Sequence, residues 1–371
     1  MSAFTSIHVT GTDWRDLCDR AVADIPDAQA ARLGFIYIAE QLAADTDRIL
    51  DYLRDRSGIP HWVGCVGLGL CSNALETYDE SALAILVTPF SDDDFRIIPA
   101  FEQNPVEWLG ATAEWRARTM ASVAVVHADP ASTQLPDLIT TLSDGLQGGF
   151  LVGGIASAQS LPVQIADRAT GNGLSGVLFS GTVAISTGLS QGCSLIGQKH
   201  RITSCHHNVI ETIDDRPALD VFKESIGEVL ARNLNKVAGY IFTALPVTGS
   251  DTGDYLVRNL VGIDPEQGLL AIGDIVNPGM EIQFARRDAE TAREDLRHMI
   301  GHLKNRLPGP ARGGLYHSCL GRGRNLFGEN SEELKLVQEL LGDVPLVGFY
   351  ANGEISHNRL YGYTGVLTLF S

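Results

Sequence analysis

Several residue classes are scarce in this sequence, and each shortage excludes a class of protein. Cysteine accounts for only 6 of 371 residues, with no Cys-x-x-Cys pair, which is too few for a fold held by disulfides. Lysine and arginine number 28 against 45 acidic residues, and the net charge of −17 disfavours nucleic acid and anionic membranes as partners. No stretch approaches the roughly 18 apolar residues of a membrane span, and the first residues lack a signal-peptide pattern. We therefore expect a cytoplasmic protein with no membrane partner.

The overall balance of hydrophobic and charged residues is typical of a large folded protein. Hydrophobic residues make up 44% of the chain and charged residues 20%, which is too little charge for a disordered protein. A chain of 371 residues exceeds what one hydrophobic core usually organises, so we expect two domains. The 39 glycines predict many tight turns or close backbone approaches.

A pattern of strand, helix, strand and strand occurs three times, beginning near residues 34, 122 and 314. In each copy a Val-Gly pair lies in the second strand, and its glycine follows the start by 30, 31 and 34 residues: Gly64, Gly153 and Gly348. We therefore predict an α/β fold of two domains built from repeated β-α-β-β units, with sheets flanked by helices. The three glycines should bring their strands close to a neighbouring backbone. The alternative is a chance resemblance among α/β segments.

The units suggest domain boundaries. Residues 1–30 contain an expected capping helix over 14–25. Two of the units fall in 31–237, which we predict to be the first domain. The third unit falls in 238–371, the predicted second domain, where it follows a long amphipathic helix over 288–307.

The clearest candidate site lies where the first strand of the third unit ends. Cys319 is followed there by Arg322, and the adjacent strand leads to Asn352 and Glu354. Ligands bind at this edge of α/β sheets, and a thiol with a guanidinium suits a carboxylate or another anion. The carboxylate and amide could hold an amine. The alternative is that Arg322 and Glu354 pair with each other and fasten the loops.

The same residues permit a second interpretation, a cysteine-dependent enzyme acting on a small substrate. Cys319 would be the nucleophile and either His317 or Glu354 the base. The arginines nearby should lower the pKa of the thiol and make it reactive. The sequence shows neither a base within reach of the Cys319 thiol nor hydrogen-bond donors for an oxyanion. We therefore expect no catalytic residue and no enzyme activity.

A third group, Cys205-His206-His207, has the residue types of a metal site. On a strand, His206 and His207 would point to opposite faces, so at most one of them could join a given site. We expect neither a bound metal nor a cofactor. One of these histidines as an axial haem ligand is the remaining interpretation.

These motifs together resemble the FIST family, named for F-box and intracellular signal transduction proteins. The resemblance covers roughly residues 30–370. It is carried by Val63-Gly-Cys-Val-Gly67, Val152-Gly-Gly-Ile155, Leu189-Ser-Gln-Gly-Cys193, Tyr255-Leu-Val-Arg-Asn-Leu-Val-Gly-Ile-Asp264, Ser318-Cys-Leu-Gly-Arg-Gly323 and Val344-Pro-Leu-Val-Gly-Phe-Tyr350 with Asn352-Gly-Glu-Ile355. On this basis 31–237 is similar to the N-terminal FIST domain and 238–371 to the C-terminal one.

The resemblance implies a stand-alone sensory protein that binds a small ligand, an amino acid or a small carboxylate, and signals through a separate partner protein. It adds Gln191, Arg258 and Asn259 to the expected ligand-binding residues, in a pocket where the two domains meet. Some relatives bind haem and report nitric oxide, and others recognise protein targets. The resemblance therefore also admits a haem-based nitric oxide sensor or a target-recognition scaffold.

Overall fold

The computed structural model describes residues 3–25, 31–232, 234, 237, 239–247 and 254–371. The chain forms two compact units, which are described separately. The first consists of residues 1–191 with 295–371, and the second of residues 192–294. This division differs from the expected segments 31–237 and 238–371, because residues 192–294 interrupt the chain of the first unit.

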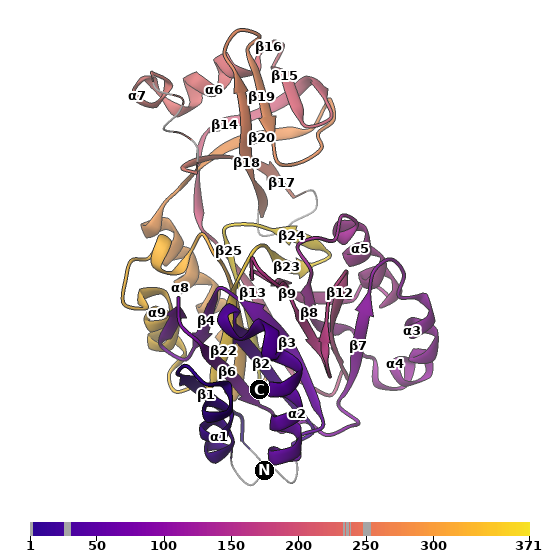
Figure 1. Cartoon of the computed structure of the whole chain (residues 1–371). Helices are drawn as coiled ribbons and strands as arrows, with labels where there is room; N and C mark the ends of the chain where they lie inside the picture. Colours follow the sequence, from indigo (N-terminus) through magenta and orange to yellow (C-terminus); the bar gives the residue numbers. More distant parts are fainter. Residues whose placement is uncertain (1–2, 26–30, 233, 235–236, 238, 248–253) are drawn as a thin grey trace. The chain divides into compact units, whose positions relative to one another are not determined.

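Three six-stranded sheets build the first unit (Figure 1). In spatial order, the first sheet contains β1 (Thr5–Thr10), β6 (Ala82–Val87), β2 (Leu33–Ala39), β3 (His61–Gly67), β10 (Gln164–Ala166) and β11 (Ala169–Thr170). The second contains β7 (Phe95–Phe101), β12 (Leu174–Phe179), β8 (Val123–Ala128), β9 (Phe150–Ile155), β23 (Glu354–His357) and β24 (Arg359–Tyr361). The third contains β13 (Ile185–Gln191), β25 (Thr364–Phe370), β21 (Gly313–Cys319), β22 (Leu346–Ala351), β4 (Gly69–Ser72) and β5 (Leu75–Tyr78).

Each of these sheets has one parallel strand pair at its centre: β2 with β3, β8 with β9, and β21 with β22. The first member of each pair also borders an antiparallel strand, β6, β12 or β25. On the other side, each sheet is completed by a hairpin from a different part of the chain. The hairpin β10–β11 joins β3, β23–β24 joins β9, and β4–β5 joins β22.

The expected close approach of Gly64, Gly153 and Gly348 is confirmed, and we call these three the close-approach glycines. Each lies in the second strand of a parallel pair. A Cβ placed on them would lie 1.7, 1.8 and 1.7 Å from the carbonyl oxygen of the residue opposite. Any side chain at these positions would collide with the neighbouring backbone.

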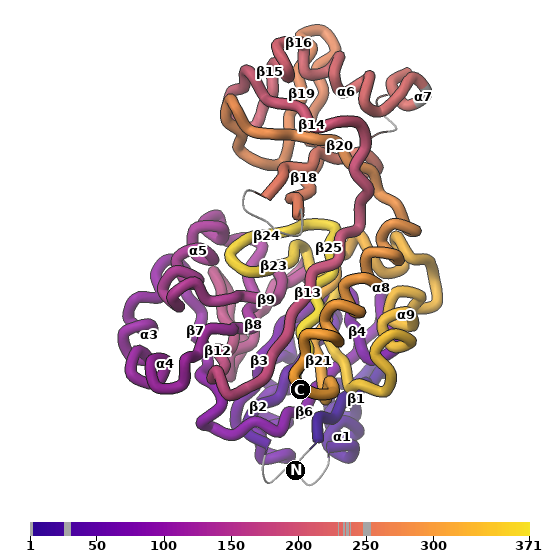
Figure 2. Tube along the Cα trace, turned by 180° about the vertical axis from the view of Figure 1, so that it is seen from behind, coloured from indigo at the N-terminus to yellow at the C-terminus, as the bar shows by residue number. Residues whose placement is uncertain are grey.

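The three sheets share one hydrophobic core. Inward-facing side chains from all three meet there, among them Phe35, Val125 and Leu315. Helices cover the outer faces (Figure 2): α1 (Trp14–Asp24) and α2 (Thr46–Ser57) pack on the first sheet, and α5 (Leu135–Gly145) packs on the second with α3 (Val106–Ala111) and α4 (Ala113–Thr119) nearby. On the third sheet lie α8 (Ala289–Arg306) and α9 (Glu332–Leu341). The short 3-10 helix η1 (Glu40–Asp45) follows β2 of the first sheet, and η3 (Gly323–Asn325) follows β21 of the third.

The N-terminal segment is more than the expected capping helix. Its helix α1 is close to the expected range, and Asp13 caps it by accepting hydrogen bonds from the backbone N–H groups of Arg15 and Asp16. The strand β1 before it was not expected. It pairs with β6 and is part of the first sheet, so the segment belongs to the first unit.

The part of the second unit that the structure describes contains a seven-stranded sheet and two short α-helices. Its strands, in spatial order, are β14 (Cys193–His206), β20 (Glu281–Arg287), β17 (Ile241–Pro246), β18 (Tyr255–Asp264), β19 (Leu269–Ile272), β15 (Val209–Ile213) and β16 (Arg216–Pro217). The helices are α6 (Ala218–Ile226) and α7 (Glu228–Ala231). Phe222 of α6 and Phe284 of β20 pack in its core, with ring centroids 5.1 Å apart.

Candidate functional site

The ends of three strands of the first unit bring together several of the expected site residues. Cys319 is the last residue of β21, Gln191 the last of β13, and Glu354 the first of β23. Thr364 links them: it pairs with Gln191 across the β13–β25 ladder, and it donates hydrogen bonds from its backbone N and Oγ1 to Glu354 Oε2, at 3.2 and 2.8 Å. We call Gln191, Cys319, Glu354 and Thr364 the strand-end site. Thr364 was not predicted from the sequence.

Glu354 is the unusual member of the strand-end site. Its side chain is fully buried, and its second oxygen, Oε1, has no hydrogen-bond partner among the described residues. Burial raises the pKa of this carboxyl to about 8, although its hydrogen bonds to Thr364, the charge of Arg322 and the Cys319 thiol act in the opposite direction. At neutral pH Glu354 is therefore mostly an uncharged acid, which can both donate and accept a hydrogen bond.

The expectation of an activated Cys319 thiol was wrong. Cys319 is partly exposed, and its Sγ accepts a hydrogen bond from the backbone N–H of Gly321 at 3.4 Å. Burial within the site and the neighbouring Glu354 carboxyl raise its pKa, and the charge of Arg322 only partly offsets this. The arginine is present as expected, but desolvation outweighs it, and the thiol stays protonated at neutral pH.

Arg322 does not pair with Glu354. Its fully buried guanidinium donates from Nε to Glu333 Oε1 at 2.8 Å, and the Glu333 side chain is equally buried. Its other nitrogens make long contacts of 3.4 Å to Ser190 and Tyr316. The ring of Phe327 lies 5.1 Å from the guanidinium carbon. Arg322 therefore fastens the loop after β21 to α9 and has little capacity left for a ligand.

Glu333 is the partner of Arg322, and this role was not predicted from the sequence. The helix α9 begins at Glu332, and the side chain of Glu333 is fully buried. Besides Arg322, it accepts hydrogen bonds from Tyr316 Oη at 2.7 Å, Ser318 Oγ at 3.1 Å and the backbone N of Gly323 at 2.7 Å. These partners come from β21 and the loop after it, so only the fold brings them to Glu333.

The remaining ligand-binding candidates belong to a turn of the first unit and to a strand of the second unit. Asn352 is in the turn between β22 and β23, with an exposed side chain and a backbone N–H that donates to Ile155 O at 3.0 Å. Arg258 and Asn259 belong to β18 of the second unit. There Arg258 Nε is 2.7 Å from Asp274 Oδ2, and the Asn259 side chain is exposed.

His317 is held in the core of the first unit. Its Nε2 lies 2.9 Å from Tyr37 Oη, and burial lowers the pKa of the imidazole to about 3. The ring is therefore uncharged at neutral pH. The hydroxyl of Tyr37 engages Nε2, and the other nitrogen, Nδ1, is buried.

The histidines considered for haem lie in the second unit. His206 ends β14, and His207 is in the turn before β15 with a φ of 52°. Because the strand stops there, the two rings do not point to opposite faces, and their centroids are 4.4 Å apart. Both are exposed. Within the described residues, no three His, Cys, Asp or Glu side chains are grouped as a metal site.

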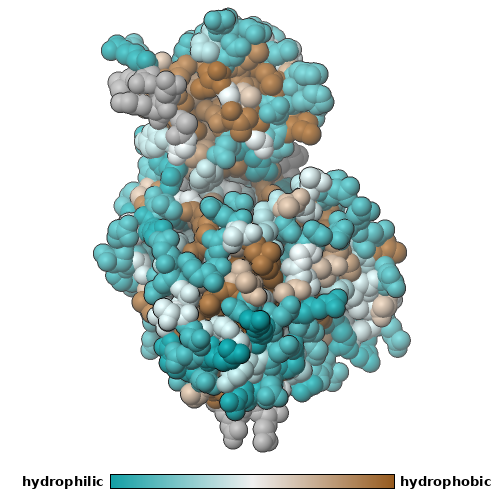
Figure 3. Space-filling view, viewed as in Figure 1, coloured by the Kyte–Doolittle hydropathy of each residue, from teal (hydrophilic) through white to brown (hydrophobic). Residues whose placement is uncertain are grey.

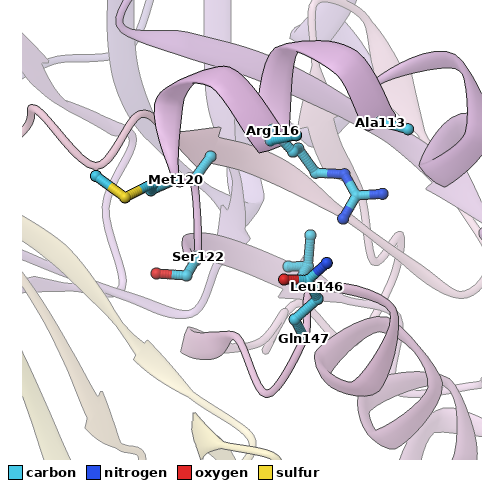
Figure 4. Close-up of a pocket in the computed structure, with 8 residues that line it drawn as sticks. Ala113, Arg116, Met120, Ser122, Leu146 and Gln147 are labelled. Atoms are coloured by element: carbon cyan, nitrogen blue, oxygen red, sulfur yellow. The ribbon is translucent and has the colours of Figure 1, made fainter.

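A surface cavity of about 460 Å³ lies at the ends of α4 and α5, away from every expected residue (Figure 4). Arg116 lines it together with Met120 and Gln147. The guanidinium is already hydrogen bonded to Leu109 O, Gly145 O and Thr112 Oγ1, at 2.8, 2.9 and 3.3 Å. Arg116 thus connects three helices, and the cavity has no built polar site.

The surface of the second unit carries exposed apolar side chains (Figure 3), among them Val261 and Ile275. Across the described ranges of the chain, no helix combines the length and hydropathy that crossing a membrane requires.

Comparison with known proteins places the chain in a family. The model of the FIST N domain matches residues 32–216, and that of the FIST C domain matches residues 218–357. The chain is 33% identical over 325 residues to the uncharacterized protein Rv0628c of Mycobacterium tuberculosis, covering 83% of each chain. It is 28% identical over 379 residues to the uncharacterized protein Mb0898c of Mycobacterium bovis, covering 97% of each. The two family matches span most of the sequence, and the chain therefore belongs to the FIST family.

Proposed function

We propose that this protein is a cytoplasmic sensory protein that binds an amino acid or a small carboxylate and signals through a separate partner protein. FIST domains are generally sensory domains that bind small ligands, which supports the general part of this proposal.

One observation carries the choice of site: the unpartnered oxygen of the buried Glu354. Buried polar atoms in proteins are nearly always hydrogen bonded, so an unused carboxyl oxygen beside the partly exposed Cys319 suggests a missing partner. As an uncharged acid, Glu354 can donate its proton to a ligand carboxylate. In the same position it can accept a hydrogen bond from a ligand amine.

From the sequence, Arg322 was expected to bind the ligand carboxylate, and the proposal changes this. Glu333 already satisfies the Arg322 charge, so the proposed donors to an anion become the Glu354 acid and the Cys319 thiol. Both are donors only while they are protonated. Carboxylate binding should therefore weaken as the pH rises through the pKa of Glu354, about 8.

Thermal-shift screening against amino acids and small carboxylates tests the proposal. At about 100 times Kd, a true ligand should stabilise the protein by about 2.7 kcal/mol. Glu354→Gln keeps a neutral donor and should bind the carboxylate at pH 7 and also at pH 9, where the wild type binds weakly. Glu354→Leu should not bind it.

The matched control is Glu339→Gln, on the exposed side of α9, which should behave as the wild type. A ligand that stabilises Glu354→Leu as much as the wild type would exclude the strand-end site. Pull-down from cells with the ligand-loaded protein then tests the partner, and cell fractionation tests the location.

The enzyme alternative has no observation in its favour. A cysteine nucleophile requires a thiolate and a base within reach. Here the pKa of Cys319 is raised, Glu354 is mostly protonated at neutral pH, and His317 is bound to Tyr37. A thioester or acyl adduct trapped on Cys319, with turnover lost in Cys319→Ser, would reverse this conclusion.

We further propose that ligand binding needs no cofactor. Both histidines of the β14–β15 turn are exposed, whereas an axial haem ligand usually lies in a pocket that encloses the porphyrin. Metal analysis and a Soret-region spectrum after haem addition test this. Stoichiometric haem that is lost in His206→Ala or His207→Ala would favour the haem-sensor alternative.

We also propose that the three sheets of the first unit are copies of one β-α-β-β unit. Their identical strand order and the matching positions of the close-approach glycines support this. Superposition of the three segments in an experimental structure tests it. If Gly64, Gly153 and Gly348 did not superpose, the common strand order would be convergent.

A further inference from the structure

The carboxyl of Glu76 lies at the edge of the third sheet and has no role in the proposed function. Glu76 belongs to β5, which pairs with β4 and is the last strand on that side of the sheet. Its backbone N–H donates to the hydroxyl of Ser331, the N-cap residue of α9, with N and Oγ 2.9 Å apart. The edge strand is thus attached to a residue 255 positions later in the sequence.

Acidic and phenolic side chains surround the Glu76 carboxyl. Oε2 accepts a hydrogen bond from Tyr78 Oη at 3.3 Å, whereas Oε1 is buried without a hydrogen-bond partner among the described residues. The ring of Tyr78 packs on that of Tyr350, with centroids 5.1 Å apart, and Tyr350 Oη lies 3.5 Å from Glu333 Oε2. Two carboxyls, those of Glu76 and Glu333, are therefore connected by a pair of tyrosines.

The arginines of this region are engaged by other acids. Arg322 Nε lies 2.8 Å from Glu333 Oε1, and both side chains are fully buried. Arg324 Nη1 lies 2.6 Å from Asp79 Oδ2. No ion pair within the described residues includes Glu76. A negative charge on Glu76 would therefore lie near that of Glu333 without a cation of its own, which is unfavourable in a partly buried position.

This environment shifts the titration of the carboxyl. Burial and the neighbouring Glu333 carboxylate raise the pKa of Glu76 to about 7. Donor groups of Tyr350, Tyr78 and the Leu334 backbone act in the opposite direction and are outweighed. Glu76 therefore changes its charge close to neutral pH.

The remaining titratable side chains around this carboxyl do not change charge near neutral pH. Burial raises the pKa of the Cys71 thiol on β4 and of the Tyr78 and Tyr350 hydroxyls, so all three stay protonated. The two arginines keep their charge. On the opposite face of β5, His8 Nε2 lies 2.8 Å from Thr77 Oγ1, and burial lowers the pKa of this imidazole, which is therefore uncharged at neutral pH.

We propose that Glu76 is a pH-sensitive switch that controls the attachment of β5 to α9. While its carboxyl is protonated, Glu76 lies beside Glu333 without repulsion, and β5 stays on the helix. When the carboxyl loses its proton to water, the two like charges repel each other, and β5 separates from α9 so that Glu76 becomes hydrated. The hydrogen bond from Glu76 N to Ser331 breaks in the same step, which couples the charge of the side chain to the backbone of the edge strand.

The expected size of the effect follows from linkage. In the separated strand the Glu76 carboxyl has its ordinary pKa of 4.5, and in the attached strand about 7. Attachment is therefore favoured at low pH, weakens as the pH rises from 4.5 to 7, and changes little above that range. Between pH 6 and pH 8 the equilibrium constant for separation should rise about tenfold.

Hydrogen–deuterium exchange of the full chain, followed by mass spectrometry at pH 6 and pH 8, tests the proposal. Protection factors correct for the intrinsic effect of pH on exchange and report local opening. In the wild type, the protection of the β5 amides should fall about tenfold between the two pH values. At pH 8 the β5 amides should also exchange faster than those of β21, because the opening is confined to the sheet edge.

Two variants separate the charge of Glu76 from other effects of pH. Glu76→Gln keeps the shape of the side chain without its charge, so β5 protection should change less than about twofold between pH 6 and pH 8. Glu80→Gln removes an exposed carboxylate four positions later and should follow the wild type. If Glu76→Gln fails to fold, the wild type measured from pH 5 to pH 9 still decides, because protection should level off above pH 7 only when the responsible pKa is near 7.

Three results would overturn the proposal. The first is β5 protection in the wild type that does not depend on pH. The second is an equal fall in Glu76→Gln. The third is equal protection of β5 and β21 at pH 8, which would mean that β5 opens only when the whole unit unfolds. No ligand enters this test, so its failure leaves the proposed function intact.

Discussion

Arg322 and Glu333 form an ion pair in which neither side chain is exposed to solvent, with Nε and Oε1 2.8 Å apart. The pair connects the loop after β21 to α9, and Tyr316, Ser318 and the backbone of Gly323 complete the hydrogen bonds of the carboxylate. Removing one partner of such a pair leaves a buried charge without compensation.

Glu333→Gln should therefore destabilise the protein by about 3–5 kcal/mol, because the Arg322 guanidinium stays buried without its counter-charge. Urea unfolding followed by circular dichroism measures the change. Glu332→Gln, at the exposed neighbouring position, is the control and should change stability by less than about 0.5 kcal/mol. Equal unfolding midpoints for the two variants would mean that the pair contributes nothing.

Glu354 should make the folded protein less stable as the pH becomes alkaline. Its folded-state pKa of about 8 lies above the ordinary value of 4.5, so the folded protein holds this proton more tightly than the unfolded chain. The resulting stabilisation is complete below pH 4.5 and is lost as the pH rises through 8. Glu354→Gln removes this loss, and at pH 9 it should be more stable than the wild type by a few kcal/mol.

Urea midpoints at pH 6 and pH 9 measure this difference. Glu339→Gln, which changes an exposed carboxylate, should follow the wild type at both pH values. If Glu354→Gln also lost stability in parallel with the wild type between pH 6 and pH 9, another group would be responsible.

Gly348→Ala should be among the most damaging single-methyl substitutions in the chain. Its Cβ would lie 1.7 Å from Tyr316 O, so the parallel strands β21 and β22 would have to separate. We expect a loss of more than about 3 kcal/mol, or failure to fold. The matched control is Gly301→Ala in α8, where nothing lies within 4 Å of the added atom. That change should stabilise the helix by up to about 1 kcal/mol.

Cys319 should react slowly with alkylating reagents despite its partial exposure. Its raised pKa leaves little thiolate at neutral pH, and the thiolate is the nucleophile. At pH 7.5, iodoacetamide should modify Cys319 more slowly than free cysteine, and the rate should still be rising above pH 8.5. Peptide mapping after timed labelling measures this. Modification faster than that of free cysteine would restore the activated-thiol interpretation.

The sequence predicted those features that depend on local pattern. A long amphipathic helix was expected over 288–307, and α8 covers Ala289–Arg306 with its apolar residues Ala292, Leu296, Met299, Ile300 and Leu303 buried. The close approach of neighbouring backbones at the three Val-Gly pairs was also expected from the local sequence. Periodicity and glycine placement are visible within a short window of sequence.

Features that depend on distant partners were missed. The strand β1 is short and carries only Ile7 and Val9 as buried apolar residues between polar ones, so it did not stand out before its pairing with β6 was known. The role of Glu333 depends on Arg322, which precedes it by 11 positions in another element. Thr364 joined the site because β25 returns beside β13, and no local signal marks that pairing.

The hairpin exchange among the sheets of the first unit has a consequence for how the protein folds during synthesis. The second sheet is completed by β23–β24, made almost 200 residues after its central pair, β8 and β9. The third sheet needs β4–β5 from near the start of the chain and β25 from near its end. Pairings that span so much sequence form slowly. A ribosome-bound chain ending near residue 216, the end of the FIST N match, would have finished only the first sheet and would expose the unpaired edge of β9, a strand edge open to aggregation or to a chaperone.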